Sequence, residues 1–239
     1  MSLLDWLYPP KCISCRTIQM PVHNKPQSYN KWLCEECRPL FVPIQEPFCL
    51  RCGHPMDDSS ICPSCKDKSF IFSSHRAAFV YEDTVRDIIH RIKFHSQKDG
   101  ATGLGHLFSE ISEDWDVEGD YIVPIPLHPS KKRSRGFNQA VLLAKPFAKL
   151  HGIPLAEDML LRVKKTAPQS GLTSVARERN LLEAFKFNGK KYSVEGKTII
   201  LTDDIFTTGA TFNSCAKSLL DQGAVRVVGI SLSIARVNF

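Results

Sequence analysis

Long apolar runs are missing from this sequence. No stretch of the chain approaches the roughly 20 consecutive apolar residues that a membrane-spanning helix needs. The first residues, MSLLDWLYPPK, also lack the basic start, apolar core and small-residue cleavage site of a secretory signal. These two absences exclude a membrane span and predict a cytoplasmic protein without membrane insertion.

The sequence has no strong excess of either charge. Its formal net charge is +6, with 23% of its 239 residues charged and 43% hydrophobic, which is the composition of an ordinary globular protein. The mild positive balance is compatible with nucleic acid or pyrophosphate as a partner. It is also common among housekeeping enzymes, so charge alone selects no function. The length suits one α/β domain together with a small second unit.

Cysteine is nearly absent after residue 65, where only Cys215 remains. The other eight cysteines form four C-x-x-C turns, namely Cys12/Cys15, Cys34/Cys37, Cys49/Cys52 and Cys62/Cys65. Each turn directs two thiolates at one point, and two turns complete the tetrahedral four-sulfur shell that zinc prefers. A disulfide framework would need an oxidising compartment, and a redox motif is normally a single pair. We therefore predict two structural zinc ions in closed shells, without an open position for catalysis.

The spacing of the four turns does not decide how they pair. Sequential pairing and a cross-braced pairing of alternate turns fit it equally well. His23 and His54 could each replace a thiolate, but eight available cysteines make them bystanders. Gly53 follows Cys52 and suits a tight turn around a metal, because a side chain would crowd the thiolates. Cys215 lies on an apolar helical stripe and is interpreted as buried packing, not as a nucleophile.

The cysteine-rich stretch predicts a small metal-stabilised module over residues 1–68, because so short a segment, interrupted by prolines, buries little core. Its cations are expected either to contact a partner or nucleic acid or to be solvated; they are Lys11, Arg16, Lys25, Lys31 and Arg51. A polar stretch at 66–74 separates this module from a second unit over residues 75–239.

The second unit alternates strand-like and helix-like segments, which predicts an α/β fold with a parallel sheet flanked by helices. Apolar spacing indicates a helix at 84–94 with Asp83 or Thr84 as its N-cap, and another near 104–111 after a glycine-containing turn. The other expected elements are strands at 75–81, 121–126, 158–163 and 225–234, a helix at 138–152 with Leu142, Leu143, Phe147 and Leu150 inward, and a hairpin of 184–188 with 191–194 around Asn188-Gly189.

The segment 199–212 is the part around which the chain is organised. An apolar run, Ile199–Leu201, meets the adjacent carboxylates of Asp203 and Asp204, then the hydroxyl-rich turn Thr207–Thr211 and a helical pattern. A strand, tight loop and helix start of this kind aim backbone N–H groups and the helix dipole at one point, where a phosphate fits. The carboxylates at the strand end are placed to reach a pair of sugar hydroxyls.

This segment resembles the phosphoribosyl pyrophosphate signature of type I phosphoribosyltransferases. The resemblance implies that Asp203 and Asp204 bind the ribose hydroxyls and act at the reacting sugar, while Thr207–Thr211 binds the 5-phosphate. The implied binding set is Asp203, Asp204, Ile205, Phe206, Thr207, Thr208, Gly209, Ala210 and Thr211. It also implies Mg²⁺ between pyrophosphate and ribose oxygens. No general base and no hood for a nucleobase is evident in the sequence, so the acceptor has no candidate.

Two further segments complete the site that the resemblance implies. The loop after the strand at 121–126 would hold pyrophosphate; it concentrates cations, of which Arg133 and Arg135 are selected as ligands. The polar stretch 164–182 would close over the pyrophosphate and exclude water. Its candidate residues are Gln169, Arg177, Arg179 and Asn180, with an ordinary surface loop as the alternative.

The segment Arg135–Gln139, RGFNQ, after a Val-Pro strand narrows the resemblance. Together with the four C-x-x-C turns, IHRIKF at 89–94 and the signature at 203–211, it is similar to the ComF family of competence proteins over nearly the whole chain. This similarity implies a protein that handles single-stranded DNA during natural transformation and keeps a pocket for phosphoribosyl pyrophosphate. The alternatives are an active phosphoribosyltransferase of nucleotide salvage and an adaptor whose zinc module docks a DNA-translocating helicase. Base-stacking aromatic residues cannot be picked out from the sequence.

Overall fold

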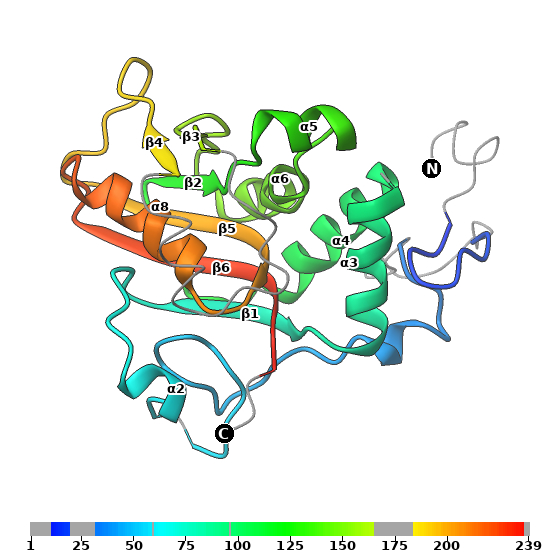
Figure 1. Cartoon of the computed structure of the whole chain (residues 1–239). Helices are drawn as coiled ribbons and strands as arrows, with labels where there is room; N and C mark the ends of the chain where they lie inside the picture. Colours follow the sequence, from blue (N-terminus) through cyan, green and yellow to red (C-terminus); the bar gives the residue numbers. More distant parts are fainter. Residues whose placement is uncertain (1–10, 20–31, 59, 96, 165–183, 237–239) are drawn as a thin grey trace.

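The computed structural model describes residues 11–19, 32–58, 60–95, 97–164 and 184–236 (Figure 1). Their largest sheet has four parallel strands in the order β1-β6-β5-β2. The strands are β1 (His75–Val80), β2 (Tyr121–Pro124), β5 (Thr198–Phe206) and β6 (Arg226–Ile234). The central strands β5 and β6 are buried over most of their length, as parallel strands covered on both faces must be. The predicted α/β class with a parallel sheet is confirmed.

Helices cover both faces of this sheet. Side chains alternate along β5, so Ile200 packs into one core while Ile199 and Leu201 pack into the other. The core of Ile200 contains α3 (Asp83–His95), α4 (Lys98–Ile111) and α6 (Gln139–His151), and the opposite core contains α8 (Ala210–Leu220). Figure 1 shows α8 lying across β5 and β6. None of the helices in the described ranges combines the length and the hydropathy of a membrane-spanning segment.

The helix predicted at 84–94 is confirmed as α3, but its predicted cap is wrong. The helix begins at Asp83, so Asp83 and Thr84 both lie in its first turn. The Arg86 N–H donates to the Glu82 carbonyl at 3.1 Å, which closes that turn one residue earlier than the apolar spacing indicates.

The predicted helix at 138–152 is also confirmed, as α6. Asn138 caps it, because its side chain accepts the backbone N–H of the residue two positions on. The expectation that Leu150 points inward is wrong, since this side chain is 44% exposed. The buried stripe of α6 runs through Ala144 and Ala148, which leaves Leu150 at its edge.

The glycine-containing turn expected before residue 104 is wrong, because its glycines, Gly100 and Gly103, lie inside α4, as does the following Gly105. A Cβ on Gly105 would lie 2.3 Å from the Leu142 carbonyl oxygen of α6, and a Cβ on Gly103 would lie 2.5 Å from Ile13 Cγ2. Close packing against α6 and the N-terminal segment therefore explains these glycines. Such contacts are made by distant residues and leave no trace in the local pattern.

The basic segment after β2 is predicted as a loop but forms the short helix α5 (Pro129–Arg135). His128 caps this helix by accepting the Ser130 N–H, and Pro129 stands at its first position, where no N–H is needed. Gly136 ends the helix in the left-handed conformation with φ 83°. The sequence thus contains the capping and termination signals of this helix, but the segment between them lacks the apolar stripe by which helices are predicted.

The hairpin predicted around Asn188-Gly189 is wrong. β4 (Phe185–Phe187) pairs antiparallel with β3 (Leu160–Arg162), and residues 191–194 form no strand. The Asn188 N–H donates to the Met159 carbonyl at 2.9 Å, and its side chain donates to the Asp158 carbonyl at 3.2 Å. Pairing with β3 therefore overrides the local turn signal.

The cysteine-rich segment packs against two different parts of the sheet domain. It contains the short helices η1 (Arg38–Leu40) and α2 (Pro63–Lys66). Arg91 of α3 donates to the carbonyls of Ile13 and Ser14 at 3.1 and 2.9 Å. The last four cysteines of the segment belong to the same apolar core as α8. The boundary between residues 1–68 and 75–239 stays a prediction.

Gly105 and Gly100 offer a matched test of the packing between α4 and α6. Gly105→Ala is expected to lower the free energy of unfolding by about 1–3 kcal/mol, because the new methyl group meets the α6 backbone. Gly100→Ala is expected to be neutral or to stabilise by about 0.5–1 kcal/mol, because its Cβ would meet only Ile92 and Gln97 side-chain atoms at 3.5 Å or more. Urea unfolding of both variants checks this, and equal effects would contradict the packing argument.

Candidate functional site

Two adjacent carboxylates lie near the carboxyl end of β5. The strand continues to Phe206, so it is longer than its apolar run indicates and contains both Asp203 and Asp204. Their side chains alternate between the two faces. Asp204 is 5% exposed and faces the core formed by α3, α4 and α6, whereas Asp203 is partly exposed. The Asp204 N–H donates to Oδ1 of Asp203 at 2.9 Å.

Lys93 of α3 pairs with the buried carboxylate. Its Nζ lies 2.9 Å from Oδ2 of Asp204. Desolvation offsets much of the attraction in such a pair, so it is better explained by a function that needs both charges than by stability. Sequence reasoning did not select Lys93 as a site residue. The available signal was the IHRIKF segment, in which Lys93 follows the apolar stripe of the helix.

Two arginines also lie within the field of the acidic pair. Arg135 of α5, selected from the sequence, is attracted by Asp204 and Asp203; burial lowers its pKa and the two carboxylates oppose that shift. Arg162 of β3 was not selected, and burial lowers its pKa against the attraction of Asp203. In the sequence, Arg162 lies at the end of a short predicted strand, and no motif there indicates a ligand-binding residue.

Lys131 of α5 adds a further positive charge near the acidic pair, where cations outnumber carboxylates. Lys131 is exposed as a whole, but desolvation of its ammonium group lowers its pKa first, and repulsion from Arg162, Arg135 and Lys93 lowers it further. Four cations from α3, α5 and β3 thus act on one another and on two carboxylates. Repulsion among them would be relieved by a bound anion.

Asp203 holds its proton more tightly than an ordinary carboxyl group. Burial is the largest cause and repulsion from Asp204 the second, and together they raise the pKa of Asp203 to about 7 against the opposing attraction of Lys93. A titrating carboxyl group in such a setting is typical of functional sites.

The turn after β5 supplies backbone and hydroxyl donors. Gly209 adopts φ 81°, in the left-handed region, and α8 begins at the next residue. Thr207 is exposed, and Thr208 and Thr211 are partly exposed, so their hydroxyls lie at the start of α8. Of the other signature residues, Phe206 and Ala210 are buried in the core that contains α8, and Ile205 packs against the opposite core. Their side chains pack in the interior, and their part in binding stays a prediction.

A cavity of about 1160 Å³ lies between α5 and β3. Arg133, the second arginine selected from the sequence, lines it together with Arg162. Asp158 also lines this cavity. Its carboxylate accepts a hydrogen bond from the Tyr192 hydroxyl at 2.5 Å and another from Lys191 at 3.0 Å. Arg162 therefore lines this cavity and also attracts Asp203 of the acidic pair.

Several predicted residues lie outside the described ranges. They are the four candidates for a closing loop, Gln169, Arg177, Arg179 and Asn180, together with His23, Lys25 and Lys31.

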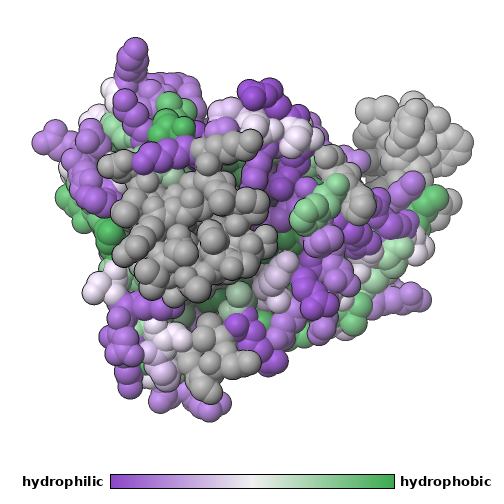
Figure 2. Space-filling view, in the orientation of Figure 1, coloured by the Kyte–Doolittle hydropathy of each residue, from purple (hydrophilic) through white to green (hydrophobic). Residues whose placement is uncertain are grey.

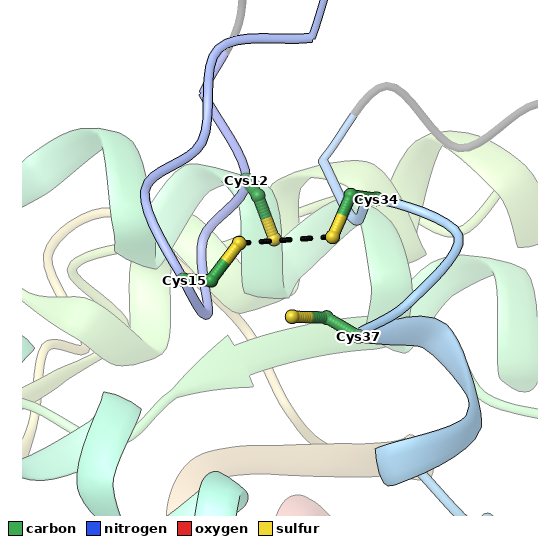
Figure 3. A group of neighbouring side chains, drawn as sticks. All are labelled: Cys12, Cys15, Cys34 and Cys37. Carbon is green, nitrogen blue, oxygen red and sulfur yellow. Dashed lines mark hydrogen bonds between the residues drawn. The ribbon is translucent and has the colours of Figure 1, made fainter.

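The eight cysteines form two four-sulfur centres, which settles the pairing as sequential. The first centre is Cys12, Cys15, Cys34 and Cys37, whose side chains converge in Figure 3, and the second is Cys49, Cys52, Cys62 and Cys65. Tetrahedral zinc with Zn–S bonds of about 2.3 Å needs sulfur atoms about 3.8 Å apart. The sulfur atoms of Cys15 and Cys34 lie 3.7 Å apart and those of Cys52 and Cys62 3.8 Å apart, and all four sulfur atoms of each centre lie within 4.8 Å of one another. Both donor sets therefore fit zinc, and the chain has two four-cysteine zinc-binding sites.

The two centres differ in exposure and in their surroundings. The cysteines of the second centre are all buried, whereas Cys15 of the first is exposed. Gly53 adopts φ 75° beside the second centre, and a Cβ there would lie 2.8 Å from the His75 carbonyl oxygen. Arg51, expected to be solvated or to meet a partner, instead donates to the Phe70 carbonyl at 2.5 Å.

Cys215 lies on α8 and is buried in the core, as predicted. Burial raises the pKa of its thiol well above the ordinary value. The thiol therefore stays protonated and packs as a small apolar group.

Replacement of Asp203 tests its unusual titration. The folded state raises the pKa of Asp203, so wild-type stability falls as the pH rises from the unfolded value near 4 to about 7. Asp203→Asn removes this titration, and its stability advantage over the wild type should grow by about 1 kcal/mol between pH 6 and pH 8. Urea unfolding measures this, with Asp221→Asn at an exposed ion pair as the control. A difference that does not change with pH would contradict the assignment.

Comparison with solved structures finds phosphoribosyltransferases at low similarity. The allosteric regulatory enzyme of purine biosynthesis matches with a TM-score of 0.39 and 21% identity, over 55% of this chain and 26% of that chain. The chain thus spans about a quarter of that enzyme. Adenine phosphoribosyltransferase from Leishmania donovani matches with a TM-score of 0.35 and 13% identity, over 59% of this chain and 54% of the other.

Sequence comparisons cover far more of the chain. Residues 3–66 match a family model described as a double zinc ribbon domain. The chain is 29% identical to the DNA utilization protein YhgH of Escherichia coli (strain K12), over 84% of this chain and 90% of that protein. It is 27% identical to Competence protein F of Haemophilus influenzae, over 91% of this chain and 93% of that protein.

Competence protein ComFC of Bacillus subtilis (strain 168) is 30% identical over 198 residues, which cover 80% of this chain and 79% of that protein. The match includes most of both chains, and the two four-cysteine centres agree with the double zinc ribbon found at the N-terminal end. On this evidence the chain belongs to the ComF family of competence proteins.

Proposed function

We propose that this protein binds phosphoribosyl pyrophosphate with Mg²⁺ at the acidic pair and handles single-stranded DNA. The observation that carries the first part is the buried ion pair of Lys93 with Asp204, 2.9 Å apart, beside Asp203. Two carboxylates suit sugar hydroxyls, and a surplus of cations around them suits a diphosphate. A sugar that carries phosphates matches both.

Each element supplies one part of this sugar site. Asp203 and Asp204 accept hydrogen bonds from the ribose hydroxyls, and the turn Thr207–Thr211 at the start of α8 binds the 5-phosphate. Lys93 and Arg135 face the diphosphate. Carboxylate and diphosphate oxygens fit Mg²⁺, which would neutralise charge on the leaving diphosphate when bound.

Calorimetry of Mg²⁺ and phosphoribosyl pyrophosphate tests the sugar site. Asp204→Asn and Lys93→Met are expected to weaken binding at least about tenfold, because each leaves a partly buried charge without its partner. Lys217→Met removes an exposed ion pair with Asp221 at the far end of α8 and should leave the affinity unchanged. If phosphoribosyl pyrophosphate does not bind to the wild type, or binds equally to all variants, the proposed sugar site is contradicted.

Exposed cations and an exposed aromatic ring near the sugar site support the proposed binding of single-stranded DNA. Lys131, Lys132 and Arg133 are exposed on α5, and Figure 2 shows strongly hydrophilic residues where α5 lies in Figure 1. Phe94 follows Lys93 at the end of α3, and its side chain is 69% exposed. Its ring lies 4.3 Å from that of His90 at an angle of 34°. An exposed ring beside cations is the arrangement on which single-stranded bases stack.

Two substitutions at Phe94 test this stacking. Phe94→Ala should weaken binding of a single-stranded oligonucleotide about tenfold, the scale of one stacked base, while Phe94→Tyr should keep it. Leu40→Ala, at a 56% exposed residue of η1, is the control. Fluorescence anisotropy at several salt concentrations measures the affinity and its electrostatic part. Equal affinity of the three variants would remove Phe94 from the proposal, and no binding by the wild type would remove the DNA part.

Relatives named for competence and DNA utilization also support handling of DNA. Phosphoribosyl transfer to a nucleobase, docking of a helicase on the zinc ribbons and a cytoplasmic location remain predictions.

A further inference from the structure

The second zinc centre is joined directly to the start of the sheet. Its knuckle, defined as Cys49–Gly53, accepts two hydrogen bonds from His75, one from the backbone N–H to the Arg51 carbonyl at 2.9 Å and one from Nδ1 to the Cys52 carbonyl at 2.8 Å. Arg51 in turn donates to the Phe70 carbonyl at 2.5 Å. The knuckle therefore fixes both the His75 ring and the segment that carries Phe70.

From His75, polar contacts continue across the sheet to the backbone of Asp204. Because a carbonyl only accepts, Nδ1 of His75 carries the hydrogen, and Nε2 faces the hydroxyl of Ser231 on β6 at 3.0 Å. The one hydroxyl hydrogen of Ser231 can point to Nε2 or to the Ser233 carbonyl oxygen, which lies 2.8 Å from Oγ, and the Ser233 hydroxyl donates to the Asp204 carbonyl at 3.1 Å. All four residues on this path are buried.

The same knuckle supports the phosphate turn through aromatic rings. The ring of Phe206 lies 4.1 Å from that of His75 and 6.3 Å from that of Phe70. A Cβ on Gly209 would lie 2.5 Å from Phe70 Cε1 and 3.1 Å from Phe206 Cζ. The turn therefore rests on two rings whose positions the knuckle sets. The Ile71 N–H, which donates to Oδ1 of Asn213 at 2.8 Å, ties the same segment to α8.

The first zinc centre makes different contacts. Its loop accepts hydrogen bonds from Arg91 of α3, and the Trp32 ring stacks on His106 of α4 at 5.4 Å. It supports the helices on the other face of the sheet. The two centres thus hold different parts of the domain.

We infer that zinc in the second centre positions the phosphate turn and Asp204, with His75 as the positioning residue between them. The inference rests on the proposed sugar site. Zinc occupancy of the second centre and affinity for phosphoribosyl pyrophosphate are then coupled, and the coupling is reciprocal: if zinc tightens the sugar by some factor, the sugar tightens that zinc by the same factor.

Variants of His75 provide the first test. His75→Phe should weaken binding of Mg²⁺ and phosphoribosyl pyrophosphate about tenfold while two zinc ions per chain are retained. His75→Asn should recover part of the affinity, because its amide can replace Nδ1 as donor to the Cys52 carbonyl. His54→Asn is the control within the same ribbon, since the His54 ring bonds to the Pro55 carbonyl at 2.9 Å. Calorimetry gives the affinity and elemental analysis gives the zinc content.

Zinc competition on the wild type provides the second test and needs no substitution that could prevent folding. A chromogenic chelator is titrated with excess Mg²⁺, with and without phosphoribosyl pyrophosphate. One of the two zinc ions should become about tenfold harder to remove when the sugar is present, and Asp204→Asn should abolish this difference. Unchanged zinc affinity in a wild type that binds the sugar would overturn the inference alone. Failure of the wild type to bind the sugar would overturn the proposed site as well.

Discussion

Two neighbouring carboxylates at the end of a buried strand impose the main electrostatic constraint on this fold. Strand alternation sends Asp203 and Asp204 to opposite faces, and Lys93, which pairs with Asp204, also attracts Asp203. Lys93 reaches Asp204 from α3, and the arginines of α5 and β3 approach from other elements. The helices and the small sheet around β5 are therefore placed by charge as well as by apolar packing.

The short cysteine-rich segment buries too little apolar surface to fold on that surface alone, and this is a second constraint on the structure. Metal binding supplies folding free energy to such a segment. Here the segment also adds to the core of its neighbour, because the buried cysteines of the second centre pack with Phe72 and Phe206. The first centre packs on α3, the helix that carries Lys93. Both ribbons thus lie next to elements that shape the acidic pair.

Local patterns predicted the elements that their own residues specify. Apolar periodicity located α3 and α6, and the C-x-x-C spacing located all eight sulfur ligands. The pairing of the C-x-x-C turns, the helical glycines of α4 and the partner of β4 depend on contacts between distant residues, which one sequence does not record. The same reason explains the site: the signature gave Asp203 and Asp204, but Lys93 and Arg162 belong to elements that only the fold brings there.

Repulsion among the cations and desolvation of Asp203 beside Asp204 are both unfavourable in the folded state. Lys131 is repelled by Lys93, Arg135 and Arg162, and Asp203 stays partly protonated at neutral pH although cations surround it. Both effects oppose folding, and both favour a ligand that is anionic and carries hydroxyl donors. A rigid support is then required, because charges that repel one another would separate if their elements could move. Packing of β5 between two cores and two metal centres provides that rigidity.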